Sequence, residues 1–522
     1  MIKKILSGNE AIALGAYKAG AGVGTGYPGT PSTEILENFI KYEDVYTEWS
    51  VNEKVALEVA IGASLAGART IVTTKHVGLN VMADPLFTSS YIGIKGGLVI
   101  INADDPFMHS SQNEQDNRNY ALAAKIPMLE PSDSQEAMEF TMLAFELSEK
   151  YDTPVIVRTT TRISHSKSVV TDDEKKVTIK PSGFERNPSK YVMIPSYARM
   201  RHIEVEKRMA SIGNDANSFD INRLEKGNKL GIITSGISYN YVREALPEAS
   251  VLKLGMVHPL PEKLVMDFFK TVERVVIVEE LDPFLETRIK AMGLNPDGKK
   301  LFPLNGEFNP DIIANALSGS SDKTQFDIPV RLPPRPPSLC PGCPHRNVFE
   351  LLNKKGFYVS GDIGCYTLGV MPPFSAIDTC IEMGASIGIA QGIEIVEGGN
   401  NKTVSVIGDS TFAHSGITGM INAAYNKRNI LMIILDNGTT AMTGMQPNPF
   451  SGETISGEQT MSIDYEKLAS SVGINPPDFR IVDAYKPDEI EKAVVEMTAS
   501  KRLSLLVVKG LCIILNRKKK KG

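Results

Sequence analysis

Short runs of apolar residues alternate with longer amphipathic stretches over the first 170 residues of the chain. The amphipathic stretches repeat their apolar residues at the spacing of an α-helix, and one of them ends near Phe39. The apolar runs are "TIVTT", "GLVII" and "PVIVR", and they are typical of parallel strands that are buried on both faces. Strands separated by helices predict a doubly wound α/β domain over residues 1–170.

The same alternation returns in two later parts of the chain. Residues 225–330 hold the apolar runs "KLGIITSG", "VLKLGM" and "RVVIVEE", and residues 331–522 hold "TVSVIGD", "ILMIILDN" and "LSLLVVKG". A proline-rich break near residue 330 separates these two parts. Residues 171–224 are rich in charged and turn-forming residues, which predicts a linker that packs across domain surfaces. The sequence therefore predicts three α/β domains.

Composition narrows the class of protein. The chain has 522 residues and 42% hydrophobic content, so it can bury several cores, and its net charge of -5 gives no field that favours nucleic acid. No apolar segment is long enough to cross a membrane and the N-terminus lacks the features of a signal peptide, so we expect a cytoplasmic protein. The basic run Lys518–Lys521 is expected to be a solvated end. Five cysteines are too few for a disulfide scaffold, and a cluster of them would indicate metal or redox chemistry.

Polar residues follow two of the predicted strands in the last part of the chain. The stretch "VSVIGDSTF" places Asp409 after one strand, and "LMIILDNGTTAMTG" places Asn437 after the next. Adjacent parallel strands end at the same edge of a sheet, where open α/β sheets bind ligands. Carboxylate and amide oxygens suit Mg²⁺, and Gly408 permits a close approach of the backbone to phosphates. Two ordinary strand-end turns are the alternative.

These two motifs resemble the diphosphate-binding signature of thiamine-diphosphate enzymes. The resemblance implies that Mg²⁺ binds Asp409, Asn437 and the backbone carbonyl of Thr439. The remaining cofactor-binding positions of the signature are Gly408, Ser410 and Gly438, and Ser410 stands where glycine is usual. The resemblance also implies a pyrimidine-binding domain over 1–170, a transketolase C-terminal-like domain over 225–330 and a diphosphate-binding domain over 331–522.

Two residues of the first predicted domain match further motifs of these enzymes. Glu53 in "NEKVALEVAIGASLAG" matches the glutamate that activates the cofactor through its aminopyrimidine ring. A solvated acid in the first turn of a helix is the alternative. Thr30 in "GYPGTPSTE" matches a threonine that touches substrate and cofactor, although Thr30 and Ser32 are also natural helix caps. The resemblance makes Glu53 and Thr30 candidate catalytic residues.

Four of the five cysteines are candidate ligands of a single metal centre. Cys340 and Cys343 form a pair in "CPGCPHR", Cys365 follows in "GDIGCYTLG", and Cys512 comes after the last strand. Four thiolates can hold one [4Fe-4S] cluster or a tetrahedral zinc ion. Structural zinc sites usually pair two short CxxC motifs, whereas the two later cysteines are isolated, which favours the cluster. Cys380 is expected to be a small buried residue instead of a ligand.

With the cysteines included, the chain resembles the 2-oxoacid:ferredoxin oxidoreductases, and within them the alpha subunits of the indolepyruvate type. "CPGCPHR", "TTKHVGLNVMADP", "DDPFMHSSQNEQD" and "DNGTTAMTGMQPNP" carry this resemblance. It implies oxidative decarboxylation of aryl 2-oxoacids, such as indolepyruvate and phenylpyruvate, to acyl-CoA and CO₂. Electrons then pass through the [4Fe-4S] cluster to ferredoxin, and coenzyme A is a co-substrate. A non-oxidative thiamine-dependent decarboxylase and a non-catalytic, zinc-stabilised subunit are the alternatives.

The resemblance also sets expectations about partners. These alpha subunits assemble with a smaller beta subunit, so a hetero-oligomer is expected. They usually continue into a ferredoxin-like domain with eight cysteines, which is absent from this sequence. Electrons are therefore expected to leave the single cluster directly to an external carrier or through a partner subunit.

The residue that holds the substrate carboxylate is not evident from the sequence. Other relatives use an arginine at a place that Ala103 occupies here, so His109 and Arg118 are guesses for the anchor. His76 and His414 either line an aromatic pocket or are structural histidines, and His345 is placed to hydrogen-bond near the cluster or the cofactor.

Overall fold

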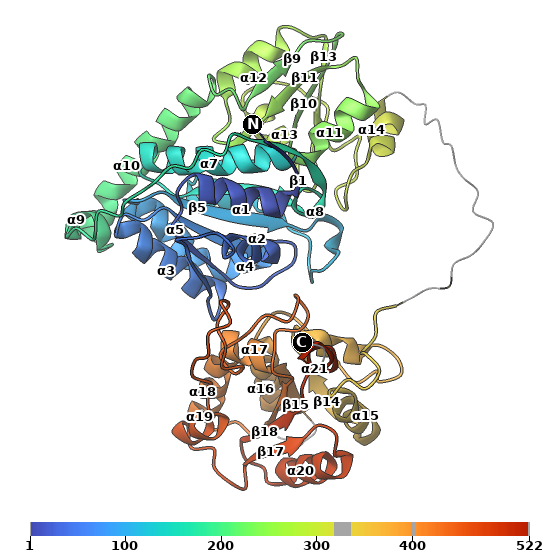
Figure 1. The fold of residues 1–522 in the computed structure, drawn as a ribbon. Coiled ribbons are helices and arrows are strands. Elements are labelled where there is room, and N and C mark those ends of the chain that lie inside the picture. The colour runs from blue at the N-terminus through green and yellow to red at the C-terminus, as the bar shows by residue number, and fades with distance from the viewer. Residues whose placement is uncertain (1, 318–332, 334–335, 398–402, 520–522) are drawn as a thin grey trace. The chain divides into compact units, whose positions relative to one another are not determined.

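The computed structural model describes residues 2–317, 333, 336–397 and 403–519 (Figure 1). The chain divides into two compact units, Met1–Phe326 and Asp327–Gly522, which are described separately. The predicted break near residue 330 and the end of the Lys518–Lys521 run lie outside the described residues. Among the described helices, none combines the length and the apolar character needed to cross a lipid bilayer.

A seven-stranded sheet forms the centre of the first unit. Its strands stand in the order β12-β6-β7-β5-β4-β2-β3, and all neighbours are parallel except β12 and β6. Every residue of β5 and β7 is buried, as the apolar runs predicted. The strands are β2 (Val23–Gly26), β3 (Tyr46–Trp49), β4 (Thr70–Lys75), β5 (Leu98–Asp104), β6 (Met128–Leu129), β7 (Val155–Thr160) and β12 (Met256–His258).

Helices cover both faces of this sheet, because side chains of successive strand residues point to opposite faces. One buried cluster contains residues of α1, α2 and α7, and another contains residues of α3, α5 and α6. The helices that follow the strands are α1 (Gly8–Lys18), α2 (Thr33–Phe39), α3 (Glu53–Leu65), α4 (His76–Val81), α5 (Ala83–Ile92), α6 (Arg118–Ala124), α7 (Ser134–Tyr151) and α8 (Thr161–His165), with a 3₁₀ turn at Pro106–Met108. The Asn52 side chain accepts a hydrogen bond from the Val55 N–H at 2.9 Å, which fixes the start of α3 at Glu53.

A smaller sheet completes the first unit. Its order is β13-β10-β11-β9, with β10, β11 and β13 parallel and β9 antiparallel. The strands are β9 (Arg223–Glu225), β10 (Leu230–Ser235), β11 (Ser250–Leu254) and β13 (Arg274–Val278), and the helices are α11 (Gly236–Ala245), α12 (Glu262–Phe269), α13 (Phe284–Ala291) and α14 (Pro310–Leu317). Strand β12 leaves this region and joins the seven-stranded sheet beside β6. The second predicted domain is therefore interlocked with the first.

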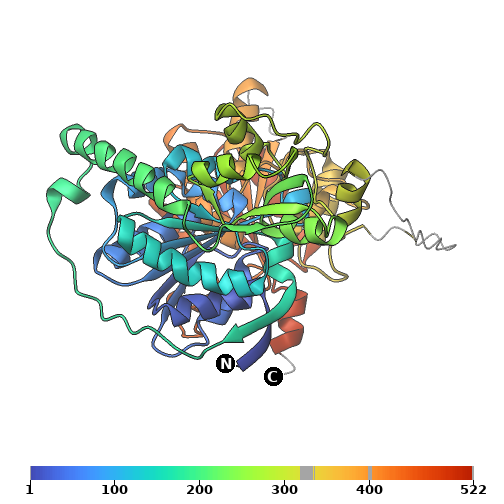
Figure 2. The same ribbon diagram turned by 90° about the horizontal axis from the view of Figure 1, so that it is seen from above.

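The stretch predicted as a linker contains regular structure. Strand β8 (Lys167–Asp172) pairs antiparallel with β1 (Ile2–Ser7). After the short helix α9 (Pro188–Tyr191) comes α10 (Pro195–Ala216), 22 residues long, which packs against α5. Figure 2 shows the extended stretch between β8 and α9 running along the outside of the unit towards α10. The stretch predicted as a linker therefore consists mainly of one long helix that packs on α5.

The second unit is a five-stranded parallel sheet in the order β14-β15-β16-β18-β17. Its strands are β14 (Tyr358–Ser360), β15 (Thr403–Gly408), β16 (Leu431–Asp436), β17 (Phe479–Asp483) and β18 (Ser504–Lys509). Its α-helices are α15 (Arg346–Lys355), α16 (Ala385–Glu397), α17 (Asp409–Thr411), α18 (Ile417–Tyr425), α19 (Tyr465–Ser471), α20 (Pro487–Ala499) and α21 (Ile513–Lys519). A 3₁₀ helix spans Cys365–Val370 and a π-helical turn spans Phe412–Gly416. Two buried clusters, one on each face, cover the sheet.

The predicted α/β class with parallel sheets is confirmed in both units. The boundaries 1–170, 171–224, 225–330 and 331–522, and the functional identities attached to them, stay a prediction.

Candidate functional site

The two strand-end motifs of the second unit meet at one edge of its sheet. Strands β15 and β16 are neighbours and parallel, with Gly408 in register with Leu435. Asp409 begins α17 directly after β15, and Asn437 directly follows β16. The structure therefore brings together the two side chains that the sequence predicted as magnesium ligands.

Negative charge accumulates at this edge. Asp409 is 2% exposed and accepts a hydrogen bond from the Asn448 amide at 3.2 Å. Burial and the neighbouring Asp436 carboxylate raise the pKa of Asp409 to about 7. Two buried carboxyl groups side by side are stabilised by a cation, and a divalent ion with oxygen ligands fits this donor set. Among the described residues, no group of three or more His, Cys, Asp or Glu side chains is placed to hold a metal ion, and this includes the four predicted cluster cysteines. Of the predicted magnesium ligands, only Asp409 has a side chain of these types.

Backbone turns fix the loop after β16. The Gly438 N–H donates to Asp436 Oδ1 at 2.9 Å, and the Thr439 N–H donates to Asn437 Oδ1 at 3.0 Å. Gly438 has a φ of 73°, in the left-handed region that favours glycine. The Thr439 hydroxyl donates to the Gln446 carbonyl at 3.0 Å, which holds the third predicted ligand. The loop is therefore preorganised by its own hydrogen bonds.

Gly408 has a packing role in addition to the one that the sequence indicated. A Cβ at this position would lie 2.6 Å from Cε1 of Tyr366, so the tyrosine ring occupies the space of a side chain. The Tyr366 hydroxyl donates to the Ile363 carbonyl at 2.8 Å. Ser410, next to Asp409, is 8% exposed and tolerated in the buried turn. Tyr366 and Asn448 were missed by the sequence interpretation because only the fold brings them to Gly408 and Asp409.

All four predicted cluster ligands line one cavity of about 100 Å³. Cys340 and Cys343 come from the turn before α15, Cys365 begins the 3₁₀ helix, and Cys512 precedes α21. Burial raises the pKa values of the Cys343 and Cys365 thiols to about 11, so both thiols are neutral at pH 7. Cys380 does not line this cavity, and it is partly exposed, so the prediction that it is a buried residue is wrong.

Asn437 connects the cysteine cavity with the edge that carries Asp409. It lines the cavity, and its backbone carbonyl accepts a hydrogen bond from the Cys512 N–H at 3.0 Å. Its side-chain amide nitrogen lies 3.4 Å from Nε2 of His345, another residue of the cavity wall. Burial lowers the pKa of His345 to about 4, so the neutral ring accepts this hydrogen bond. Asn437 therefore belongs to both predicted sites of this unit.

Glu53 in the first unit is buried at the start of α3. It is 5% exposed, so the alternative of a solvated helix-start glutamate is wrong. The carboxylate lies over α4, since a Cβ on Gly78 would come within 2.5 Å of Glu53 Oε1. A buried carboxylate of this kind is a candidate for proton transfer.

Thr30 lies in the loop between β2 and α2. Its backbone carbonyl accepts a hydrogen bond from the Ser110 hydroxyl at 3.1 Å. Ser32 precedes α2, but its hydroxyl donates back to the Gly29 carbonyl at 2.8 Å and does not cap the helix. The helix-cap interpretation of this motif therefore fails for Ser32.

The two guesses for a substrate-carboxylate anchor do not fit the structure. Arg118 is 1% exposed, and its guanidinium group donates to Glu279 at 2.7 Å and to the Glu280 carbonyl at 3.0 Å. It also binds Asp116. His109 lies 2.9 Å from a Glu307 carboxylate oxygen. Both groups are already paired, so neither guess is retained.

His76 and His414 are both buried. His76 Nε2 lies 3.0 Å from Asn113 Oδ1, and His414 Nδ1 lies 2.7 Å from the Ser415 hydroxyl. These contacts are typical of structural histidines.

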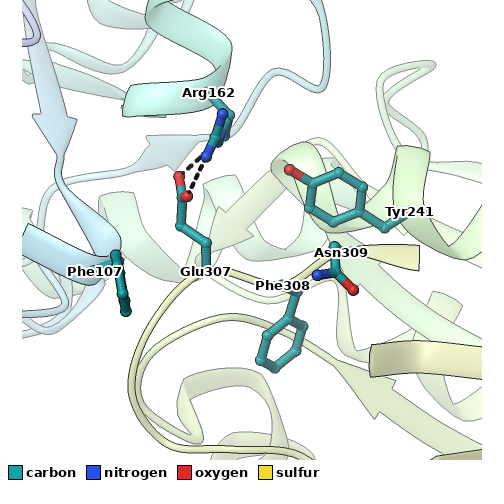
Figure 3. A pocket seen from close by; sticks show the side chains of 6 residues that line it. All are labelled: Phe107, Arg162, Tyr241, Glu307, Phe308 and Asn309. Atoms are coloured by element: carbon teal, nitrogen blue, oxygen red, sulfur yellow. Dashed lines mark hydrogen bonds and ion pairs between the residues drawn. The ribbon is translucent and has the colours of Figure 1, made fainter. Parts of the chain in front are cut away.

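A further cavity of about 390 Å³ lies in the first unit, and the sequence did not indicate it. Figure 3 shows the side chains of Arg162 and Glu307 in contact beside the cavity. The Arg162 guanidinium donates to the two Glu307 carboxylate oxygens at 2.9 and 2.7 Å. Its lining residues come from four separate parts of the chain: Phe107, Arg162, Tyr241, Glu307, Phe308 and Asn309.

Two family models match the chain. The model described as "Pyruvate flavodoxin/ferredoxin oxidoreductase, thiamine diP-bdg" matches residues 14–225. The model described as "Thiamine pyrophosphate enzyme, C-terminal TPP binding domain" matches residues 362–508.

Curated relatives match almost the whole chain. Indolepyruvate oxidoreductase subunit IorA of Archaeoglobus fulgidus is 42% identical, over 94% of this chain and 83% of the relative. The subunit of the same name from Pyrococcus horikoshii is 41% identical, over 98% of this chain and 86% of the relative. A solved structure of 2-oxoglutarate:ferredoxin oxidoreductase from Magnetococcus marinus has a similar fold, with a TM-score of 0.52 and 19% identity, over 61% of this chain and 65% of that one.

Proposed function

Because the chain belongs to the family of indolepyruvate oxidoreductase subunits IorA, we propose that it is the catalytic subunit of an enzyme that oxidatively decarboxylates 2-oxoacids. The 2-oxoacid loses CO₂, its acyl group passes to the thiol of coenzyme A, and one proton is released. Two electrons pass, one at a time, to two molecules of ferredoxin. Aryl 2-oxoacids of the indolepyruvate and phenylpyruvate type are the proposed substrates, in line with the names of the relatives.

The observation that carries this proposal is that the two predicted sites of the second unit have Asn437 in common. Asn437 belongs to the edge with Asp409 and also lines the cavity of the four cysteines. A non-oxidative decarboxylase has no use for an electron outlet beside its cofactor. A thiol cavity in contact with the diphosphate-binding loop therefore favours the oxidative reaction.

Thiamine diphosphate, when bound, supplies the nucleophilic carbon and the electron sink for decarboxylation. In this proposal Asp409, Asn437 and the Thr439 carbonyl hold the Mg²⁺ that neutralises the diphosphate. Gly408, Ser410 and Gly438 form the turns on either side. Glu53 holds a proton at the aminopyrimidine ring, a role for which its burial at the start of α3 is suited.

Cys340, Cys343, Cys365 and Cys512 hold the proposed [4Fe-4S] cluster. Support comes from the cavity that all four thiols line. A smaller beta subunit and ferredoxin are the proposed partners, since the relatives are named as subunits. Ferredoxin is the proposed external acceptor of the electrons.

The test is an anaerobic assay of the purified complex with phenylpyruvate, a branched 2-oxoacid and pyruvate. We expect reduction of ferredoxin that depends on coenzyme A and is fastest with phenylpyruvate. Release of the aldehyde without reduction of the acceptor would instead identify a non-oxidative decarboxylase. Absence of thiamine diphosphate binding in a calorimetric titration with Mg²⁺ would point to a non-catalytic subunit.

Substitution Cys512→Ala is expected to remove or destabilise the cluster. Cys512 lines the cavity with the other three thiols, so its loss leaves one iron without a protein ligand. Iron content and the broad absorption near about 400 nm that is typical of iron–sulfur clusters should both fall. The control is Cys380→Ala, because Cys380 lies outside the cavity. Unchanged iron content in Cys512→Ala would remove this residue from the ligand set.

A further inference from the structure

The substrate of the proposed reaction carries a carboxylate, and the anchor expected from relatives is missing. By the sequence resemblance, Ala103 on β5 is expected to stand where other relatives have that arginine. In the parallel pairing of β4 with β5, Ala103 stands in register with Lys75, the last residue of β4. A basic side chain therefore stands next to the vacant position, on the neighbouring strand.

Lys75 lies along the loop that carries Thr30. Its side-chain carbons cover Gly29, since a Cβ on Gly29 would lie 3.1 Å from both Cγ and Cδ of the lysine. Its ammonium group donates to the Ser110 carbonyl at 2.9 Å, and the Ser110 hydroxyl donates to the Thr30 carbonyl at 3.1 Å. Ser110 thus ties the lysine to the Thr30 loop.

Lys75 also adjoins the element that packs on Glu53. Helix α4 begins at His76, directly after Lys75, and its Gly78 lies against the Glu53 carboxylate. Burial lowers the pKa of Lys75 to about 8, against the opposing effect of Asp105 and Glu53. The side chain therefore remains mostly charged at neutral pH.

Several other basic side chains at this edge of the sheet are already paired with carboxylates. No described ion pair involves Lys75. Its ammonium group has three N–H donors, and one of them donates to the Ser110 carbonyl. The paired groups are Lys54 with Glu58, His109 and Arg162 with Glu307, Arg118 with Asp116 and Glu279, Arg158 with Asp104 and Glu130, and His165 with Glu34.

We propose that Lys75 binds the carboxylate of the 2-oxoacid substrate. This inference rests on the proposed function and adds a substrate-binding residue to it. Three observations support it. Lys75 has N–H donors beyond the one that binds Ser110, it stands in register with Ala103, and Ser110 connects it to the Thr30 loop. A point charge on a flexible stem accepts carboxylates in a range of orientations, in contrast to the fixed fork of an arginine.

The experiment compares the wild-type complex with Lys75→Met, using phenylpyruvate as substrate. The KM is expected to rise by about 10- to 100-fold, the range for a hydrogen bond to a charged group, with a smaller change in kcat. Calorimetric affinity for thiamine diphosphate with Mg²⁺ should stay the same.

Lys75→Gln keeps a donor for the Ser110 carbonyl but loses the charge, so it should show the same rise in KM without a change in thermal stability. Lys54→Met is the matched control, because Lys54 is exposed and pairs with Glu58.

A second measurement separates direct contact from a structural role. The wild-type complex should bind 3-phenylpropanoate more tightly than its neutral carboxamide, and this preference should disappear in Lys75→Met and Lys75→Gln. An unchanged preference in both variants would overturn the assignment of Lys75 while leaving the proposed function intact. A wild-type complex that turns over none of the 2-oxoacids would overturn the proposed function and this assignment with it.

Discussion

Substitution Glu53→Gln is expected to lower turnover by about 10² to 10⁴-fold, the usual contribution of a positioned proton-transfer group. Glu53 is 5% exposed and packs against Gly78, and glutamine has the same shape, so the fold and the cofactor site should persist. Only the ability to hold a proton at the aminopyrimidine is lost. The anaerobic rate of ferredoxin reduction measures the first effect, and calorimetric titration of thiamine diphosphate with Mg²⁺ measures the second.

The matched control is Glu58→Gln on the same helix. The Glu58 side chain is 44% exposed and pairs with Lys54, so this change should leave the rate within about twofold, as is usual for surface substitutions. Retention of more than a tenth of the wild-type rate by Glu53→Gln would contradict the proposed role. Loss of cofactor binding in that variant would indicate a structural role instead.

Substitution Asp409→Ala is expected to abolish measurable binding of thiamine diphosphate with Mg²⁺. Even outer-shell partners of a metal typically contribute 10- to 100-fold in affinity, and a direct carboxylate ligand contributes at least about that much. Burial and Asp436 raise the pKa of Asp409 to about 7, so the ionised carboxylate destabilises the folded apoprotein. The apoprotein should therefore remain folded when this side chain is removed. Thermal melting with and without cofactor measures both effects, since a ligand that binds only the folded state raises the melting temperature.

Asp483→Asn provides the comparison for this prediction. Asp483 ends β17 in the same sheet but is exposed, and it bonds the Tyr485 N–H at 2.8 Å. Its substitution should leave the rise in melting temperature on cofactor addition unchanged. The role of Asp409 would be refuted by an equal rise in Asp409→Ala.

The sequence predicted those parts of the site that depend on strand order and local motifs. Asp409 and Asn437 follow consecutive apolar runs, and parallel pairing of β15 with β16 is enough to bring them to one edge. Cys340, Cys343, Cys365 and Cys512 were grouped because four thiolates can hold one metal centre, and the fold brings all four to one cavity although two of them are isolated in the sequence.

Long-range pairing was the part that could not be predicted. Arg118 looked available in sequence, but Glu279, 161 residues away, binds it in the folded chain. Lys75 did not stand out, because its position depends on register with Ala103 and on the pairing of the other basic groups. Strand β12 is only three residues long, so its apolar run was too short to indicate that it crosses to another sheet.

Strand β12 has a consequence for fragments of this protein. The pyruvate oxidoreductase family model ends at residue 225, before β12 (Met256–His258) is reached. A fragment cut there would leave the buried strand β6 as an open edge, with Met128 and Leu129 unpaired on that side. Exposed apolar edges promote association between chains. During synthesis, the seven-stranded sheet likewise stays incomplete until the chain has passed through β9, β10 and β11 of the smaller sheet. We therefore expect the two sheets of the first unit to unfold in a single cooperative transition.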